Sequence, residues 1–269
     1  MLKITSMNLR ALPLAVGAAL LALGSGCKQP KLNCTTAHGY YAAAYELKSG
    51  DANSPCGSLP GDILGMQTYY ATGGLNGTPR YDEASIAIRV DSVDQQLFFA
   101  LTYPDEADDP SLLSDPDALH YGLNALGDFT AGLPDDADFC MVPELDASAV
   151  KLPAIAEKPA VEDDPMTPDV DETDEGHPAQ DARDVRYEWS NARFLVSANA
   201  QGTQFEADLK YSENGCTAEY HVTALYPVVG CESDDECNDD ASGINPDFAV
   251  KCDSNLGLCV LSDTLPSYE

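Results

Sequence analysis

Alternation of apolar and polar residues is the clearest pattern along this chain. In CTAEYHVTALY, residues 216–226, the even positions are apolar or aromatic and the odd positions are mostly polar. The same period of two appears in FEADLKY, residues 205–211, and in ASIAIRV, residues 84–90. A strand with one buried face has this period. We therefore predict antiparallel β structure in these three segments.

Two other segments extend this prediction. QQLFFALTY, residues 95–103, follows ASIAIRV closely enough to be its hairpin partner. Between residues 185 and 198 the apolar phase shifts by one residue, which indicates a bulge near Ser190–Asn191. Helix signals are weak, and only the Pro- and Asp-rich segment 103–122 is expected to hold a single helical turn.

These strands predict an all-β fold with one antiparallel domain, either a barrel-like structure or a sandwich, over residues 34–230. Residues 154–184 interrupt it with four prolines, eleven acidic residues and almost no large apolar side chain. Such a composition buries too little surface to offset the entropy of ordering. We expect a long disordered acidic loop inside one domain, because strands are predicted on both sides of it.

The first 26 residues have the features of a secretory signal peptide. Lys3 and Arg10 lie in a start without acids, and the mostly apolar run that follows is too short for a membrane span, which needs about 20 residues. GSG then precedes Cys27, and this junction resembles the lipobox of bacterial lipoproteins, although Gly24 stands where that family prefers Leu. The resemblance implies that Cys27 carries lipid, palmitate included, and begins the mature chain, with residues 27–33 as a tether. The alternative is an ordinary signal peptide with Cys27 in a disulfide.

The number of cysteines supports the interpretation that Cys27 carries lipid. The chain has nine cysteines, and an odd number in an exported protein requires a separate fate for one of them. Without Cys27, eight remain for four disulfides in an oxidising compartment. They are Cys34, Cys56, Cys140, Cys216, Cys231, Cys237, Cys252 and Cys259. Sequence order suggests the bonds Cys34–Cys56 and Cys140–Cys216, with two more among the last four cysteines.

The last 39 residues, 231–269, differ in character from the domain before them. The cysteine spacing in CESDDECNDDASGINPDFAVKCDSNLGLCVL resembles the short cysteine-rich modules of the Dickkopf N-terminal or EGF-like kind. That resemblance implies the interleaved bonds Cys231–Cys252 and Cys237–Cys259. A segment this small has too little apolar surface for its own core, so we expect disulfides to hold it together.

The larger domain also resembles a known family. NCTTAHGYYAAAY, ALGDFTAGLPDDADFCMVPEL and YEWSNARFLVSANAQGTQFEADLKY are similar to blocks of an uncharacterised family of Gram-negative surface lipoproteins. The resemblance implies a location in the cell envelope and a β-rich architecture, and carries no known activity. Lys28 follows Cys27 where the inner-membrane retention signal of enteric lipoproteins has Asp, so we expect the outer membrane.

Charge limits the partners. The formal net charge is −31 at pH 7, from 45 acidic and 14 basic residues, and nucleic-acid binding is excluded because no basic stripe exists. Contact with the membrane is expected through the N-terminal lipid alone, and a protein partner would be another envelope protein or a cationic one. No cofactor is expected. Weak calcium candidates are Asp234, Asp235, Asp239 and Asp240; DVDETDEG, residues 169–176, misses the EF-hand spacing.

Catalytic motifs are absent from the sequence, which contains no G-x-S-x-G, H-E-x-x-H or phosphate-binding glycine loop. Of the four histidines, His177 and His221 are expected to be exposed, whereas His38 and His120 lie beside tyrosines in segments that can be ordered. We therefore predict a non-enzymatic, lipid-anchored envelope protein with a binding or structural role. The alternatives are a carrier of a small apolar ligand in a lipocalin-like cavity and, more weakly, an envelope hydrolase.

Overall fold

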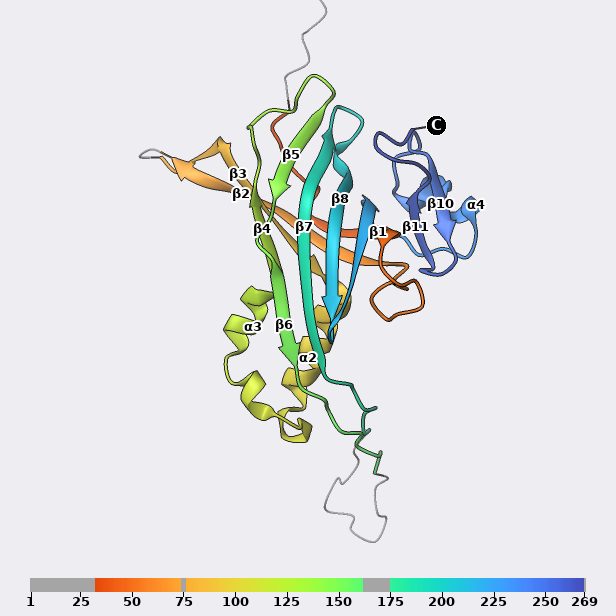
Figure 1. Ribbon diagram of the computed structural model, residues 1–269. Helices are drawn as coiled ribbons and strands as arrows, with labels where there is room; N and C mark the ends of the chain where they lie inside the picture. The colour runs from red at the N-terminus through yellow and green to blue at the C-terminus, as the bar shows by residue number, and fades with distance from the viewer. Residues whose placement is uncertain (1–31, 74–75, 162–174, 269) are drawn as a thin grey trace, which may run out of the picture. The chain divides into compact units, whose positions relative to one another are not determined.

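A computed structural model describes residues 32–73, 76–161 and 175–268 (Figure 1). The signal peptide, Cys27 and the centre of the acidic loop lie outside the described residues. Residues from Leu32 onward form one compact unit. Its strands are β1 (Gly39–Ser49), β2 (Gly61–Gly73), β3 (Thr78–Val90), β4 (Asn124–Asp128), β5 (Phe139–Glu144), β6 (Ser148–Leu152), β7 (Arg183–Val196), β8 (Gln201–Glu213), β9 (Cys216–Leu225), β10 (Val250–Asp253) and β11 (Leu258–Leu261). The helices are α2 (Asp91–Thr102), α3 (Pro116–Gly122) and α4 (Asp234–Cys237), with 3₁₀ turns at Pro104–Glu106, Pro110–Leu113 and Asp240–Ser242.

Nine of these strands form one antiparallel sheet in the order β4-β3-β2-β1-β9-β8-β7-β5, with β6 paired to β7 as well. The sheet nearly closes on itself where β4 approaches β5. Two backbone hydrogen bonds cross this seam, from Thr130 N to Met141 O (2.9 Å) and from Asp146 N to Leu126 O (2.7 Å). Gly127 permits the approach, because a Cβ there would lie 2.6 Å from Cγ1 of Val142. The predicted all-β class is therefore confirmed, and of its two forms the barrel-like one is observed.

The strands predicted from alternation are all present. CTAEYHVTALY forms β9, FEADLKY lies in β8, and ASIAIRV ends β3. The expected bulge is present too, since the pairing of β7 with β8 shifts between Ser190 and Arg193. Asn191 has a φ of 52°, a left-handed conformation that asparagine tolerates better than most residues.

The predicted hairpin partner of β3 is wrong, because QQLFFALTY belongs to helix α2. Val93, Leu97 and Ala100 are its buried residues, at spacings of four and three that place them on one helix face. Val93 and Leu97 join the interior cluster of the sheet, whereas Ala100 packs with Leu113 and Ile155. Figure 1 shows α2 and α3 at the end of the sheet where β6 and β7 meet the acidic segment.

The prediction of disorder across residues 154–184 is wrong at both ends of that segment. Ile155 is buried and exchanges two backbone hydrogen bonds with Gln180, and Lys158 exchanges two with His177. The two ends therefore run alongside each other as an irregular antiparallel pair. The compositional argument failed here because Ile155 and His177 find apolar partners beside α2.

The cysteine-rich tail does not depend on its disulfides alone, contrary to our expectation. Its apolar residues form a cluster with Phe139, Leu195 and Leu225 on the outer face of the large sheet and with Ala200 in the β7–β8 connection. The amide of Gln204 on β8 also pairs with the backbone of Ser267, through two hydrogen bonds of 2.9 Å. Sequence alternation missed this surface because β7 and β8 are buried on both faces here, as Phe194, Leu195 and Val196 illustrate. The domain boundary at residue 231 stays a prediction.

Candidate functional site

Four strands present a groove on the outer face of the sheet. Cross-strand pairing places Tyr40 of β1 opposite Gly65 of β2, Gly65 opposite Arg89 of β3, and Arg89 opposite Asn124 of β4. These four residues form one row across the sheet, and in the next row Gln67 lies opposite Ala87. Because side chains alternate between faces along a strand, both rows project away from the interior.

Small residues form the floor of this groove and tyrosines border it. Gly65 and Ala87 line it in adjacent rows of the sheet, together with the side chains of Tyr40, which is 56% exposed, and Tyr69, which is 49% exposed. The Tyr40 ring covers part of Gly65, since a Cβ on that glycine would lie 3.6 Å from Cε1 of the ring. The hollow has a volume of about 340 Å³, within the range of small-molecule sites.

A polar cluster forms the end of the groove next to α2. The guanidinium of Arg89 donates to Oδ1 of Asp94 at 2.5 Å and to Nδ1 of His120 at 2.9 Å. Asn124 then donates to the backbone carbonyl of His120 at 3.1 Å. A guanidinium can only donate, so Nδ1 of His120 accepts and Nε2 carries the ring proton in this arrangement. Arg89 is therefore held in place, and its charge is balanced by Asp94.

The interior of the barrel-like sheet is filled by side chains. The inward-facing residues form a single apolar cluster, in which Tyr41, Phe194, Phe205, Tyr211 and Tyr220 are fully buried. Neighbouring rings touch: the centroids of Phe194 and Phe205 are 4.8 Å apart, and those of Tyr187 and Tyr211 are 4.9 Å apart. This packing argues against a lipocalin-like cavity and leaves the outer groove as the candidate binding surface.

A second polar cluster lies near the Cys56–Cys216 bond and beside a larger surface hollow. Arg183 donates to Glu213 at 2.5 Å, to Gln96 at 2.6 Å and to the hydroxyl of Tyr211 at 2.9 Å. The Tyr211 hydroxyl donates in turn to Glu213 at 2.6 Å, and burial raises the pKa of this phenol. All of these groups satisfy one another, so the cluster is structural.

The histidines singled out from the sequence do not meet in one site. His38 is exposed just before β1, and His120 belongs to the polar cluster of the groove. His221 faces Asp208 at 3.7 Å on the polar side of β9. The expectation that His177 is exposed is wrong: it is only 8% exposed, and its ring lies 3.9 Å from that of Tyr103, centroid to centroid.

The eight cysteines in the described part of the chain form four disulfides, and two of the predicted pairs are wrong. The bonds are Cys34–Cys140, Cys56–Cys216, Cys231–Cys252 and Cys237–Cys259. Cys34 reaches Cys140 because the segment before β1 lies beside the β4–β5 connection, where Cys34 N donates to the carbonyl of Gly132. Cys56 follows β1 and reaches the start of β9, the strand that pairs with β1. The two tail bonds have the predicted interleaved order.

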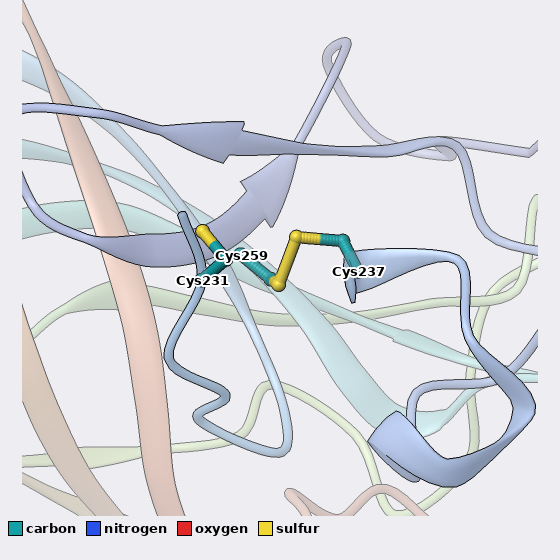
Figure 2. A group of neighbouring side chains, drawn as sticks. All are labelled: Cys231, Cys237 and Cys259. Carbon is teal, nitrogen blue, oxygen red and sulfur yellow. A yellow bond between two sulfur atoms is a disulfide. The ribbon is translucent and has the colours of Figure 1, made fainter. Parts of the chain in front are cut away.

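Metal-ligating side chains gather at one place within residues 32–73, 76–161 and 175–268. Cys231, Cys237 and Cys259 have sulfur atoms within 4.8 Å of one another (Figure 2). Figure 2 shows Cys237 joined to Cys259, and Cys231 is bonded to Cys252. Disulfide sulfurs are not thiolates, so this group is a pair of crosslinks and not a metal centre.

The calcium candidates of the tail serve the local backbone. Oδ1 of Asp234 accepts from Cys252 N at 2.7 Å, and Oδ1 of Asp239 accepts from Ala241 N at 2.7 Å. Asp235 and Asp240 are exposed. Calcium binding here stays a prediction, and DVDETDEG falls largely outside the described residues.

The groove residues were not found from the sequence. Tyr40, Tyr69 and Arg89 are ordinary outward-facing positions of three different strands, and only the register of those strands brings them together. The available signal was the glycine inside β2, because Gly65 interrupts a strand without making a turn.

Fold and groove together define a disulfide-crosslinked, barrel-like β protein with a hollow on its outer face. A family model described as MlpA matches residues 39–227, more than half of the chain, and the chain therefore belongs to the MlpA family. The match begins at β1 and ends just beyond β9, so it covers the large sheet and stops before the cysteine-rich tail.

The chain is also similar to a described lipoprotein. "Putative lipoprotein MlpA" of Myxococcus xanthus is 39% identical over 98 residues, which cover 33% of this chain and 41% of the relative. The chain thus matches less than half of that protein's length. No solved structure matches the chain significantly. Among the helices that the structure describes, none has the length and apolar character needed to span a membrane.

Proposed function

We propose that this chain is a lipid-anchored protein of the cell envelope with a non-enzymatic binding role, exercised through the groove on β1–β4. The observation that carries the proposal is the pairing of all eight cysteines from Cys34 onward. Cys27 is the one remaining cysteine of the nine in the sequence, and none of these eight is its partner. It stands at the lipobox-like junction, where a thioether to diacylglycerol is the fate that the resemblance implies.

Location in the envelope has two further supports. Four disulfides are typical of proteins that mature in an oxidising compartment, which the periplasm and cell surface are and the cytoplasm is not. The relative from Myxococcus xanthus is described as a lipoprotein. With Lys28 after the anchor, we assign the chain to the outer membrane.

The chemistry of the groove supports a non-enzymatic role. The described residues that line it include no serine, threonine or cysteine to act as a nucleophile. Of its two carboxylates, Asp94 is paired with Arg89 and Asp91 accepts from Gln95 at 2.5 Å. Such fixed, mutually paired groups recognise a ligand by hydrogen bonds and shape. The filled interior disfavours the alternative of an apolar ligand carried inside the sheet.

The tail contributes a structural part to this function. It covers the outer face of β5, β7 and β9 through its apolar cluster. The groove lies on other strands of the same sheet, β1–β4. Its interleaved disulfides have the order found in EGF-like modules, so we keep the likeness to such a module as a hypothesis.

Metabolic labelling with tritiated palmitate tests the anchor. The full chain, expressed in a Gram-negative host, should take up label and fractionate with the outer membrane, because two or more acyl chains hold a protein firmly. The Cys27→Ala variant should be unlabelled, and Lys28→Ala, its neighbour, should label normally. Label that persists in Cys27→Ala, or a wild-type chain without label, would overturn the proposal.

A further inference from the structure

The groove has a definite chemical character that goes beyond a general binding role. We infer that it binds a short stretch of a neutral glycan, an inference that rests on the proposed function and specifies its ligand. The carrying observation is the combination of two exposed tyrosines, a floor of small residues and a rim of fixed planar polar groups in one hollow of about 340 Å³.

The tyrosines suit the apolar faces of sugar rings. A pyranose presents a patch of C–H bonds on its face and hydroxyl groups around its edge, and an aromatic ring packs on the former. Tyr40 and Tyr69 each offer a rigid ring with few rotatable bonds and a hydroxyl at the rim. Gly65 and Tyr69 are four residues apart on β2, which spans about 13 Å, so the groove is longer than one sugar unit.

The polar rim suits the hydroxyl edge of the same ligand. Gln67 and Asn124 provide amides, which both donate and accept, and Asp91 provides a carboxylate that accepts. Arg89 is held by Asp94 and His120 before any ligand arrives, so little side-chain entropy is lost on binding. Hydroxyl groups, which donate and accept, match this mixture better than a purely apolar or purely charged ligand does.

Charge favours a neutral glycan over an anionic or a cationic one. The chain carries a net charge of −31, which repels sulfated, sialylated and uronic-acid sugars. Inside the groove the guanidinium of Arg89 balances Asp94, and the second lining carboxylate, Asp91, accepts a hydrogen bond from Gln95. A cationic ligand would meet that guanidinium at short range.

A glycan array followed by calorimetry tests the inference. The full lipid-anchored chain in detergent is applied to neutral, amino-substituted and acidic oligosaccharides, and the strongest neutral oligosaccharide is then titrated in solution. Tyr40→Ala and Tyr69→Ala should each weaken its affinity roughly tenfold, as loss of an aromatic anchor does. Tyr121→Ala is the matched control, since Tyr121 on α3 is 77% exposed and does not line the groove.

Gly65→Leu provides a second variant, which fills the floor and keeps both tyrosines in the sequence. A Cβ at Gly65 lies 3.6 Å from Cε1 of Tyr40, so the rest of the leucine displaces the Tyr40 ring and should abolish binding, and thermal unfolding checks that this variant is folded. Binding of a neutral glycan that ignores the tyrosine and Gly65 variants would overturn the groove as the site. Binding of charged glycans alone, or of none, would overturn the ligand class. Palmitate labelling is independent of these results and separates failure of this inference from failure of the anchor.

Discussion

Replacing Cys56 and Cys216 together by alanine should lower the free energy of unfolding by about 4–5 kcal/mol. The bond closes a loop with a sequence separation of 160 residues. In the unfolded chain the shortest covalent path from Cys56 to Cys216 runs through the Cys34–Cys140 bond, so the effective loop has about 100 residues. The chain-entropy model predicts a stabilisation of about 4.7 kcal/mol for a loop of that length. Total stabilities are about 5–15 kcal/mol, so the loss is a large share.

Urea unfolding of the wild type and the double variant, followed by the fluorescence of the buried Trp189, measures this difference. The matched control removes the tail bond between Cys237 and Cys259, whose separation of 22 residues predicts a smaller loss of about 3 kcal/mol. A loss below about 1 kcal/mol for the Cys56/Cys216 variant would refute the entropic reasoning. Non-reducing peptide mapping that found Cys34 bonded to Cys56 would refute the connectivity on which it rests.

Three other stability predictions use matched positions. Gly65→Ala should stabilise the fold by about 0.5 kcal/mol, because alanine fits there and loses less conformational entropy on folding than glycine. Gly61→Ala should destabilise it by about 1–3 kcal/mol, because φ is +155° and a Cβ would lie 2.0 Å from the carbonyl oxygen of Ala43. Thermal unfolding compares the two variants. Tyr45→Phe should be neutral or stabilising in urea unfolding, since its buried hydroxyl has no hydrogen-bond partner among the described residues. Tyr220→Phe should cost about 1 kcal/mol, since its hydroxyl bonds to the backbone of the β1–β2 connection. Burial raises the pKa of Asp62, so the folded chain binds this proton more tightly than the unfolded chain, and stability should fall as pH rises from the ordinary carboxyl value through the raised one. Asp62→Asn should reduce that fall in a pH series of unfolding curves, and an unchanged slope would contradict the assignment.

Local periodicity predicted the strands well because one face of each was buried and the other was not. Helix α2 was mistaken for a strand because the run LFFALT has the aromatic residues of a strand, although Val93, Leu97 and Ala100 follow helical spacing. The surface beneath the tail was also missed, because burial on both faces of β7 hides the alternation there.

Long-range features could not be predicted from order along the chain. The bond between Cys34 and Cys140 depends on where the sheet nearly closes, and nothing local to either cysteine encodes that seam. The groove likewise depends on register, which places Tyr40, Gly65 and Arg89 side by side from three strands. The tail bonds were predicted from the resemblance of their cysteine spacing to EGF-like modules, and their loops are short, with sequence separations of 21 and 22.

Mass spectrometry of the N-terminal peptide tests the central proposal, a lipid-anchored envelope protein, most directly. The full chain is expressed in a Gram-negative host, extracted from the membrane fraction with detergent and digested, and the lipid-soluble peptides are sequenced. We expect a first peptide that begins at Cys27 and carries a diacylglyceryl group on its sulfur with an additional acyl chain. A mature chain that begins at another residue, or one whose Cys27 is unmodified or in a disulfide, would contradict it.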